Sequence, residues 1–279
     1  MKSAGKRKIR LLSLLFLALF GLGMANPPAL PYDPGMTDYT GWVTANGDTY
    51  YLRDGSPLTG LRLVEGQYCF FDAHGIKARA VGVDVSTYSE GIDWALAKAQ
   101  GIDFAVIRVG GRGWTSGSVY GDVRAQTYLR DSQKAGIKRG VYFYSTAVNE
   151  HEAVEEAEAV LRVLGGRALE LPVYCDLEFS GEYPEGRADR LNAGERTQIA
   201  LAFCRKIESA GYRAGVYSGQ YYFQHHLIGS ALRRYQLWLA AYTADGMPPD
   251  FAGRCGLWQF TDRGSVSGMR CGTDMNVMF

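Results

Sequence analysis

From Val81 to the end of the chain, short apolar runs alternate with segments of helical periodicity. The runs are VGVDVS, FAVIRVGG, GVYFYSTA, LPVYCDLEF, AGVYSG, QLWLAAY, GLWQFT and DMNVMF. Short strands separated by helices are typical of α/β proteins with parallel strands and crossover helices, and about eight of them predict a TIM-like β/α barrel. The helical segments thin out toward the C-terminus, so we expect an irregular barrel that is partly antiparallel or lacks helices at its end.

A doubly wound open sheet is the alternative architecture. No Gly-x-Gly-x-x-Gly motif follows the first strand, however, which weakens the case for a dinucleotide-binding sheet. No cofactor is therefore expected.

Residues 1–25 have the organisation of a secretory signal peptide. A basic segment precedes an apolar run from Leu11 to Leu22, and the small residues Gly23 and Ala25 follow at the positions where cleavage is expected. An uncleaved anchor is the alternative, although a membrane-spanning helix needs about 20 apolar residues and this run is shorter. We expect a protein that is secreted or associated with the cell wall, without stable membrane insertion after cleavage.

Cleavage after Ala25 changes the charge of the chain. The full sequence carries a formal charge of +1, and loss of five basic residues with the signal leaves 25 basic and 29 acidic residues, about −4. A mildly acidic protein is a poor binder of nucleic acid. We expect no nucleic-acid partner, and we expect a monomer.

The five cysteines of an exported chain leave at least one outside intramolecular disulfides. Cys255 and Cys271 flank one loop near the C-terminus and are the candidate disulfide, whereas Cys175 and Cys204 lie in apolar patterns that suit buried thiols. No Cys-x-x-Cys or His-Glu-x-x-His spacing occurs, so no metal site is expected.

A linker at residues 26–39 leads into an internal repeat at residues 40–79. The units TGWVTANGDTYYLRDG, from Thr40, and TGLRLVEGQYCFFDAHG, from Thr59, are offset by 19 residues. Each has a turn, at Asn46-Gly47 or Glu65-Gly66, followed by an aromatic strand. The pattern predicts a module of small β-hairpins.

This pair of units resembles the aromatic cell-wall-binding repeats of bacterial wall hydrolases and glucan-binding proteins. The resemblance implies that the aromatic residues form a ligand cradle, which would bind a wall polymer. The second unit departs from this pattern, because Leu61 stands where the first unit has Trp42. A spacer packed on the larger domain is the alternative. The implied cradle residues are Trp42, Tyr50, Tyr51 and Tyr68.

Four acidic residues lie in or near predicted strand ends of the barrel. Asp84 belongs to the first strand, Asp176 and Glu178 to the fourth, and Asp274 to the last. First and last strands are neighbours in a closed barrel, so the acids are expected to converge at the end where catalysis gathers. Two carboxyl groups buried together raise at least one pKa, which keeps an acid protonated for glycosidic bond cleavage.

In order and spacing, residues 80–279 resemble glycoside hydrolase family 25, the Chalaropsis-type lysozymes. The resemblance rests on GVDVS, GVYFYS, YCDLE, WLAAY, LWQFT and TDMNVMF, and covers about seven-tenths of the chain. It implies a modified α/β barrel that cleaves the β-1,4 bond between N-acetylmuramic acid and N-acetylglucosamine in peptidoglycan, whose glycan strands would be the partner.

The resemblance also implies roles for single residues. Glu178 becomes the general acid/base, Asp176 its partner, and Asp84 and Asp274 the flanking acids. Each candidate groove residue could contact the sugar or could simply pack in the core. For Arg108, an ordinary buried ion pair is a further alternative. These candidates are Tyr142, Tyr144, Tyr217, Trp238, Gln259 and Arg108.

Two other functions remain open at the level of sequence. One is a different amino-sugar glycosidase on the same barrel, and the other is a wall-binding protein without catalysis. The strand spacing of Asp176 and Glu178 does not choose between retaining and inverting arrangements. Because muramic acid carries a 2-acetamido group, our hypothesis is net retention with acetamide participation.

Overall fold

The computed structural model describes residues 38–89, 91–181, 185–251, 255–269 and 272–279. The predicted signal peptide at 1–25, almost all of the predicted linker at 26–39, and Cys271 lie outside the described residues.

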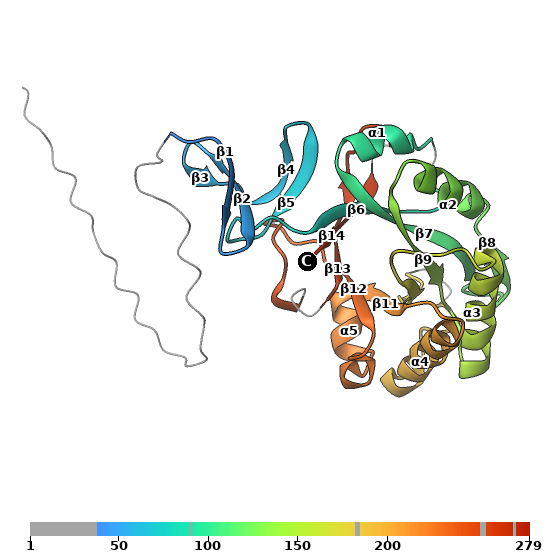
Figure 1. The fold of residues 1–279 in the computed structure, drawn as a ribbon. Helices are drawn as coiled ribbons and strands as arrows, with labels where there is room; N and C mark the ends of the chain where they lie inside the picture. Colours follow the sequence, from blue (N-terminus) through green and yellow to red (C-terminus); the bar gives the residue numbers. More distant parts are fainter. Residues whose placement is uncertain (1–37, 90, 182–184, 252–254, 270–271) are drawn as a thin grey trace, which may run out of the picture.

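Within the described residues, eight strands close a barrel (Figure 1). Neighbouring strands from β6 round to β13 are parallel, whereas β14 is antiparallel to both β13 and β6. The barrel strands, in the order in which they pair, are β6 (Ala80–Val85), β7 (Ile102–Arg112), β9 (Lys138–Tyr144), β10 (Val173–Asp176), β11 (Ala214–Gly219), β12 (Gln236–Ala240), β13 (Leu257–Gly264) and β14 (Thr273–Met278). The short β8 (Val119–Gly121) pairs with β7. The prediction of a closed, partly antiparallel barrel is confirmed.

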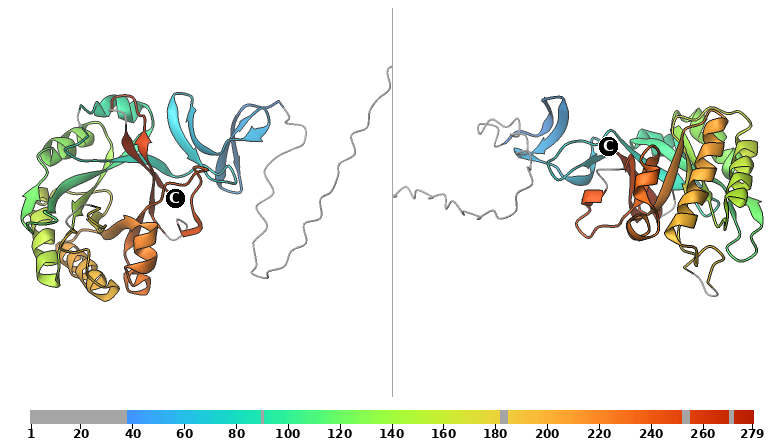
Figure 2. Two further views of the ribbon diagram at one scale, coloured as in Figure 1. Left: turned by 180° about the vertical axis from the view of Figure 1, so that it is seen from behind. Right: turned by 90° about the horizontal axis from the view of Figure 1, so that it is seen from below.

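Helices cover the parallel part of the barrel and form an arc around it (Figures 1 and 2). They are α1 (Trp94–Ala99), α2 (Ala125–Lys134), α3 (Glu150–Leu164), α4 (Ala193–Ser209) and α5 (Gln220–His225), with a 3₁₀ turn, η1, at Gly229–Leu232. Side chains of Asp93, Asn149 and Asn192 accept hydrogen bonds from backbone N–H groups in the first turns of α1, α3 and α4. No α-helix follows β12 or β13 in the described part of the chain, as the thinning of the helical pattern predicts.

Aromatic side chains fill the interior of the barrel. The ring of Trp238 lies 4.3 Å from that of Tyr217, 5.2 Å from Tyr174 and 5.7 Å from Tyr142, between centroids. Glycines on facing strands make room for such rings, since a Cβ at Gly215 would come within 2.6 Å of the Tyr174 ring. The packed interior closes the barrel below the acids.

The N-terminal module consists of hairpins with tight turns. β1 (Gly41–Ala45) pairs with β2 (Asp48–Arg53), which also pairs with β3 (Ser56–Pro57), and β4 (Gly60–Val64) pairs with β5 (Gln67–Phe71). Both predicted turns have positive φ at two successive residues, 54° and 90° at Asn46 and Gly47, and 52° and 81° at Glu65 and Gly66. Such turns match the twist of the paired strands.

The β4–β5 hairpin packs against β13, the barrel sector that no described helix covers. The Phe70 ring lies 5.5 Å from Trp258 and 5.6 Å from Phe260, and the hydroxyl of Tyr68 donates a hydrogen bond to the carbonyl of Ser265 at 2.6 Å. In Figures 1 and 2 the module lies beside this open side of the helical arc. The hairpin therefore buries the outer face of β13 where a crossover helix would otherwise lie.

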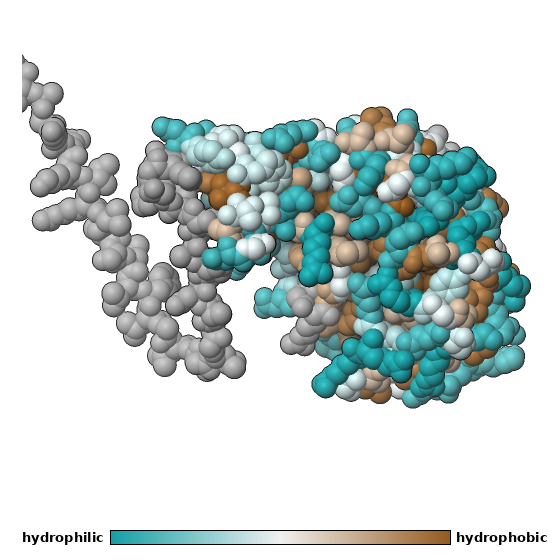
Figure 3. Space-filling view, viewed as in Figure 1, coloured by the Kyte–Doolittle hydropathy of each residue, from teal (hydrophilic) through white to brown (hydrophobic). Residues whose placement is uncertain are grey.

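The face of the molecule in Figure 3 is mostly hydrophilic, with apolar patches between the polar side chains. This is the pattern expected of helices that bury one side against a sheet. Within the described residues, we find no helix with the length and apolar character that a membrane span requires.

Candidate active site

The four predicted acids lie at one end of the barrel. Asp84 on β6 stands directly opposite Asp274 on β14 in the antiparallel ladder. Asp176 is the last residue of β10, and Glu178 follows just beyond the strand, with Cys175 and Leu177 facing the outer core. Side chains alternate between the two faces of β10. One face packs on helices and is apolar, while the other reaches the mouth of the barrel and carries the acids.

Asp84 is the centre of a hydrogen-bond network. Its Oδ2 accepts hydrogen bonds from Gln259 Nε2 and Asn276 Nδ2, each at 2.8 Å. Trp238 Nε1 donates to Asn276 Oδ1 at 2.7 Å, which fixes the orientation of that amide. The hydroxyl of Tyr217 donates to Gln259 Oε1 at 2.9 Å. Asp84 is thus held in place by side chains from β13 and β14, which are oriented in turn by side chains from β12 and β11.

The carboxyl groups of Asp84 and Asp274 lie within hydrogen-bond reach of each other. Burial raises the pKa of Asp84, and hydrogen bonds from Asn276, Gln259 and Asp274 oppose that rise. The pKa of Asp274 is raised to about 8 by burial, by the charge of Asp84 and by the hydrogen bond that it donates to Asp84. Asp274 therefore carries the proton near neutral pH, and Asp84 carries the charge.

Asp176 and Glu178 have different environments. Asp176 is buried, and its pKa is raised strongly by burial, then by the charges of Glu178 and Asp84. Glu178 is open to solvent at the mouth, yet the protein around it displaces enough water, with the charge of Asp84, to raise its pKa to about 7. A carboxyl group that is both accessible and protonated near neutral pH has the properties of a general acid.

One buried acceptor at this site has no partner. Among the described residues, Oδ1 of Asp176 accepts no hydrogen bond although it is inaccessible to water. Leaving such an acceptor unsatisfied costs about 1–3 kcal/mol. The protein keeps this unsatisfied oxygen two residues before an accessible acid.

The candidate groove residues divide into interior and mouth. Trp238, Gln259 and Tyr217 are buried and support the network. Tyr142 and Tyr144 are partly exposed on β9, and burial raises the pKa of both, with a further rise from nearby carboxylates. These two tyrosines are the ones placed to contact a ligand.

Arg108 forms an ion pair with an acid outside the predicted set. Its Nε donates to Asp122 Oδ2 at 2.8 Å, and its guanidinium lies 5.0 Å from the centroid of the exposed Tyr88 ring. The charge of Arg108 still lowers the pKa of Asp176. Arg108 therefore acts on the acids through space rather than by direct pairing.

A hollow of about 270 Å³ opens beside the acids, between β14, β6 and β7. Asp274, Arg108 and Tyr142 contribute to its wall, together with Tyr88 and Met269. Because Asp274 is one of the four acids, the hollow adjoins the carboxyl groups directly.

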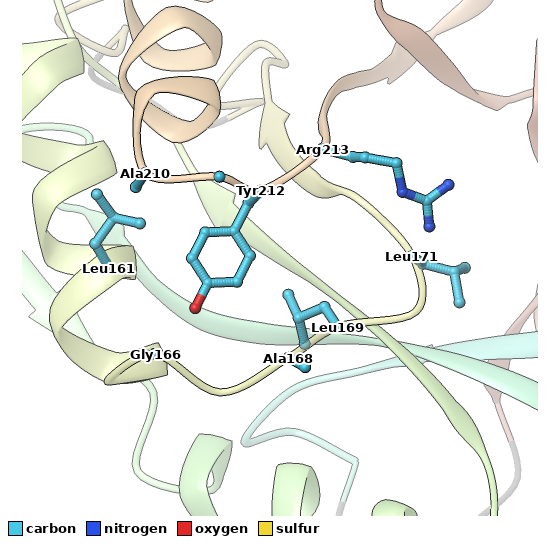
Figure 4. A pocket seen from close by; sticks show the side chains of 9 residues that line it. Leu161, Gly166, Ala168, Leu169, Leu171, Ala210, Tyr212 and Arg213 are labelled. Carbon is cyan, nitrogen blue, oxygen red and sulfur yellow. The ribbon is translucent and has the colours of Figure 1, made fainter.

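A larger cavity of about 570 Å³ lies at the opposite end of the barrel (Figure 4). The connections from α3 to β10 and from α4 to β11 form it, and the ring of Tyr212 lies within it between Leu161 and Leu169. Arg213 is its charged lining residue. None of its lining residues carries a carboxyl group.

The aromatic residues of the module differ in exposure. Tyr50 is only 2% exposed, so its ring packs inside the module and is not available to a ligand. Trp42 packs edge-on against Tyr51 at 5.0 Å, and its Nε1 donates to Glu65 Oε2 at 3.2 Å. Tyr68 is bound to the barrel, as described above. Trp42 and Tyr51 remain the accessible part of the predicted cradle.

The cysteines give a mixed outcome. Cys175 and Cys204 are fully buried thiols, as predicted. The Cys255–Cys271 disulfide stays a prediction because Cys271 lies outside the described residues. Across the described residues, no group of three or more His, Cys, Asp or Glu side chains has the arrangement of a metal site.

Three functional residues are absent from the sequence prediction. Asn276 and Tyr242 belong to the Asp84 network, since Tyr242 also donates to Gln259 Oε1 at 2.9 Å, and Asp122 is the partner of Arg108. The position of Asn276 could have been predicted from the sequence, because it follows Asp274 by two residues and therefore shares its face of the strand.

A comparison with protein-family models matches residues 83–269 to the glycosyl hydrolases family 25. The chain belongs to glycosyl hydrolase family 25. This family 25 chain is therefore a glycoside hydrolase, and the match includes Asp84, Asp176 and Glu178, while Asp274 lies just beyond its end.

Relatives of this family 25 chain include proteins from several bacteria. YegX of Escherichia coli O157:H7 is 29% identical over 208 residues, which are 70% of this chain and 68% of YegX. The autolytic lysozyme of Clostridium acetobutylicum is 23% identical over 196 residues, covering 70% of this chain and 54% of that protein. The modular autolysin LytC of Streptococcus pneumoniae, solved with a synthetic peptidoglycan ligand, has a similar structure, with a TM-score of 0.67 at 20% identity. That likeness covers 86% of this chain and 58% of LytC.

Proposed function

We propose that this protein is a secreted or wall-associated N-acetylmuramidase that cleaves the β-1,4 bond between N-acetylmuramic acid and N-acetylglucosamine in peptidoglycan. Glu178 is the general acid/base, Asp176 its partner, and Asp84 and Asp274 hold the charge pattern. The family supports a glycan substrate, and the relative LytC binds a synthetic peptidoglycan ligand.

The observation that carries the proposal is the unsatisfied Oδ1 of Asp176 beside Glu178. A muramic sugar presents a 2-acetamido N–H next to the bond to be broken, and a rotation of the Asp176 carboxyl group would bring its unpartnered oxygen to that donor. Pairing the two orients the acetamide carbonyl toward the anomeric carbon. The cost of the unsatisfied acceptor in the free protein is then recovered when substrate binds.

The reaction has two steps in this scheme. Glu178 gives its proton to the glycosidic oxygen, the bond from the anomeric carbon to that oxygen breaks, and the acetamide oxygen forms a bond to the same carbon. The Glu178 carboxylate then removes a proton from water, which attacks the anomeric carbon and reopens the ring. Two inversions give net retention.

Proton NMR of the first-formed anomer tests the stereochemistry. The expected product is the β anomer, and an inverted product contradicts the scheme. Asp176 acting as a direct nucleophile also gives retention, so trapping of a covalent sugar adduct on Asp176 separates the two mechanisms.

The function itself is tested by mass spectrometry of fragments released from purified sacculi, with chitin as a parallel substrate. We expect muropeptides that end in reducing N-acetylmuramic acid. Reducing N-acetylglucosamine ends, or cleavage of chitin in preference to sacculi, would instead indicate another amino-sugar glycosidase. If the wild type releases no muropeptides from sacculi, the protein would be a wall-binding protein without catalysis.

The hairpin module is proposed to contribute wall affinity through Trp42 and Tyr51, the aromatic residues of the module that stay partly exposed without contacting the barrel. Sedimentation with sacculi tests this role. Trp42→Ala in the Glu178→Gln background should lower the bound fraction, and unchanged binding would favour a purely structural module.

A further inference from the structure

An aromatic cluster lies on the active-site rim immediately after Glu178. Phe179 is 40% exposed and Tyr221, on α5, is 64% exposed, and exposed rings that gather in one cluster indicate a binding surface more strongly than rings exposed singly. Ring centroids in the cluster are 4.6 to 5.5 Å apart between neighbours. We call this cluster the rim platform; it consists of Phe179, Tyr221, Tyr222, His225 and His226.

A buried arginine holds the platform from behind. The guanidinium of Arg196, on α4, lies 4.9 Å from the centroid of Phe179 and 5.0 Å from that of Tyr222. Its Nη2 donates to the carbonyl of Asp189 at 2.7 Å, and the residue is only 2% exposed. The orientation of the Phe179 ring is therefore set before any ligand arrives, which lowers the entropic cost of stacking.

The platform and the 270 Å³ hollow lie across the barrel mouth from each other. The hollow belongs to β14, β6 and β7, whereas the platform follows β10 and β11, and these sets are opposite in the closed order of strands. α1 follows β6, a strand of the hollow, and α5 follows β11, a strand of the platform. These two helices lie on opposite sides of the barrel in Figure 1. Asp274 lines the hollow and Glu178 directly precedes the platform residue Phe179, so a chain that reaches both passes over the acids.

We propose that the rim platform binds the saccharide on the leaving-group side of the bond that is cleaved. This rests on the proposed function, in which Glu178 protonates the leaving oxygen, and Phe179 is the next residue in the chain. Pyranose rings have apolar C–H faces that stack on aromatic rings, and their hydroxyl groups pair with imidazole nitrogens at the edge of the platform. The hollow holds the sugars on the other side.

The test measures binding of peptidoglycan disaccharide and tetrasaccharide fragments to the Glu178→Gln variant by calorimetry. We expect the tetrasaccharide to bind at least about tenfold more tightly. Adding Tyr221→Ala should reduce tetrasaccharide affinity about three- to tenfold, the scale of one aromatic contact, and narrow the ratio of the two affinities. Tyr221→Phe retains the ring and should retain the ratio. Leu63→Ala, at an apolar residue of β4 that is 54% exposed and distant from the mouth, is the matched control and should leave the ratio unchanged.

Equal affinities for both fragments, or an unchanged ratio in Tyr221→Ala, overturn the platform while leaving muropeptide release by the wild type intact. If the Glu178→Gln variant binds neither fragment and the wild type releases no muropeptides, the proposed function falls and the platform with it. Because Tyr221 is exposed, its replacement should not affect folding, and the thermal midpoint of each variant verifies this.

Discussion

The two ends of the barrel differ in their cavities and in their chemistry. The end with the larger cavity has no acidic residue in the cavity wall, whereas the end with the smaller hollow holds the four acids. The larger cavity lies where strands β10 and β11 begin, and tight turns at Gly166 and Gly211, with φ of 80° and 86°, shape it. The smaller hollow lies where the parallel strands end, beside the four acids, of which Asp84 is held by the amides of Gln259 and Asn276. Cavity volume follows from how the chain turns, whereas chemistry follows from which titratable side chains the strands bring together.

The largest expected effect is at the acid end, in Glu178→Gln. Glutamine keeps the shape and hydrogen bonding of the side chain but has no proton to transfer. We expect kcat/KM on wall fragments to fall at least about a hundredfold, the usual contribution of general acid/base catalysis. Activity close to that of the wild type would place the acid elsewhere in the barrel.

The pH dependence of kcat/KM should report the protonation of Glu178. Glu178 has to be protonated for the first step, and its pKa is raised to about 7, so kcat/KM should decline above about pH 7, approaching tenfold per pH unit. A pH–rate profile on soluble glycan fragments checks this. A profile that is flat from pH 6 to pH 9 is the contrary result.

The same substitution at the two ends sharpens the comparison. Tyr217→Phe removes the hydroxyl that donates to Gln259, and Tyr212→Phe removes the hydroxyl that donates to the carbonyl of Arg167. We expect a loss of about three- to tenfold in kcat/KM for Tyr217→Phe, because a hydrogen bond worth about 1 kcal/mol no longer orients the Asp84 network. Tyr212→Phe should leave kcat/KM within about twofold. Equal losses in both variants would mean that the two ends are not functionally distinct.

The smallest expected effect is on stability. The pKa of Asp274 is raised to about 8 from 3.8, so between these values the folded state binds a proton that the unfolded state releases. This contribution is complete below about pH 4 and is lost as the pH rises through about 8. Asp274→Asn stays neutral, so its Tm should fall less than that of the wild type between pH 5 and pH 8. Parallel Tm curves for the two proteins would contradict the assignment of the proton.

The convergence of the acids was predictable because strand ends in a barrel share one rim and because first and last strands are neighbours. Asp176 and Glu178 share the mouth side because they stand two residues apart, whereas Cys175 and Leu177 face the outer core. Asn276 was overlooked because an amide within an apolar strand has no charge to draw attention, although its spacing from Asp274 placed it on the same face.

The role of the module was harder to predict. The outer side of β13, with Trp258 and Phe260, has the sequence pattern of any buried strand, and nothing in it indicates that a hairpin rather than a helix covers it. Tyr50 illustrates the same difficulty, since a tyrosine in a short strand has the same pattern whether it packs inward or contacts a ligand.

The most direct test of the central claim, that Glu178 keeps its proton near neutral pH beside three other acids, is a carbon-13 NMR titration of its side-chain carboxyl carbon. Comparison with Glu178→Gln assigns the signal. The account predicts a midpoint near pH 7, whereas a midpoint near 4.5, the ordinary value for a glutamic acid, would contradict it.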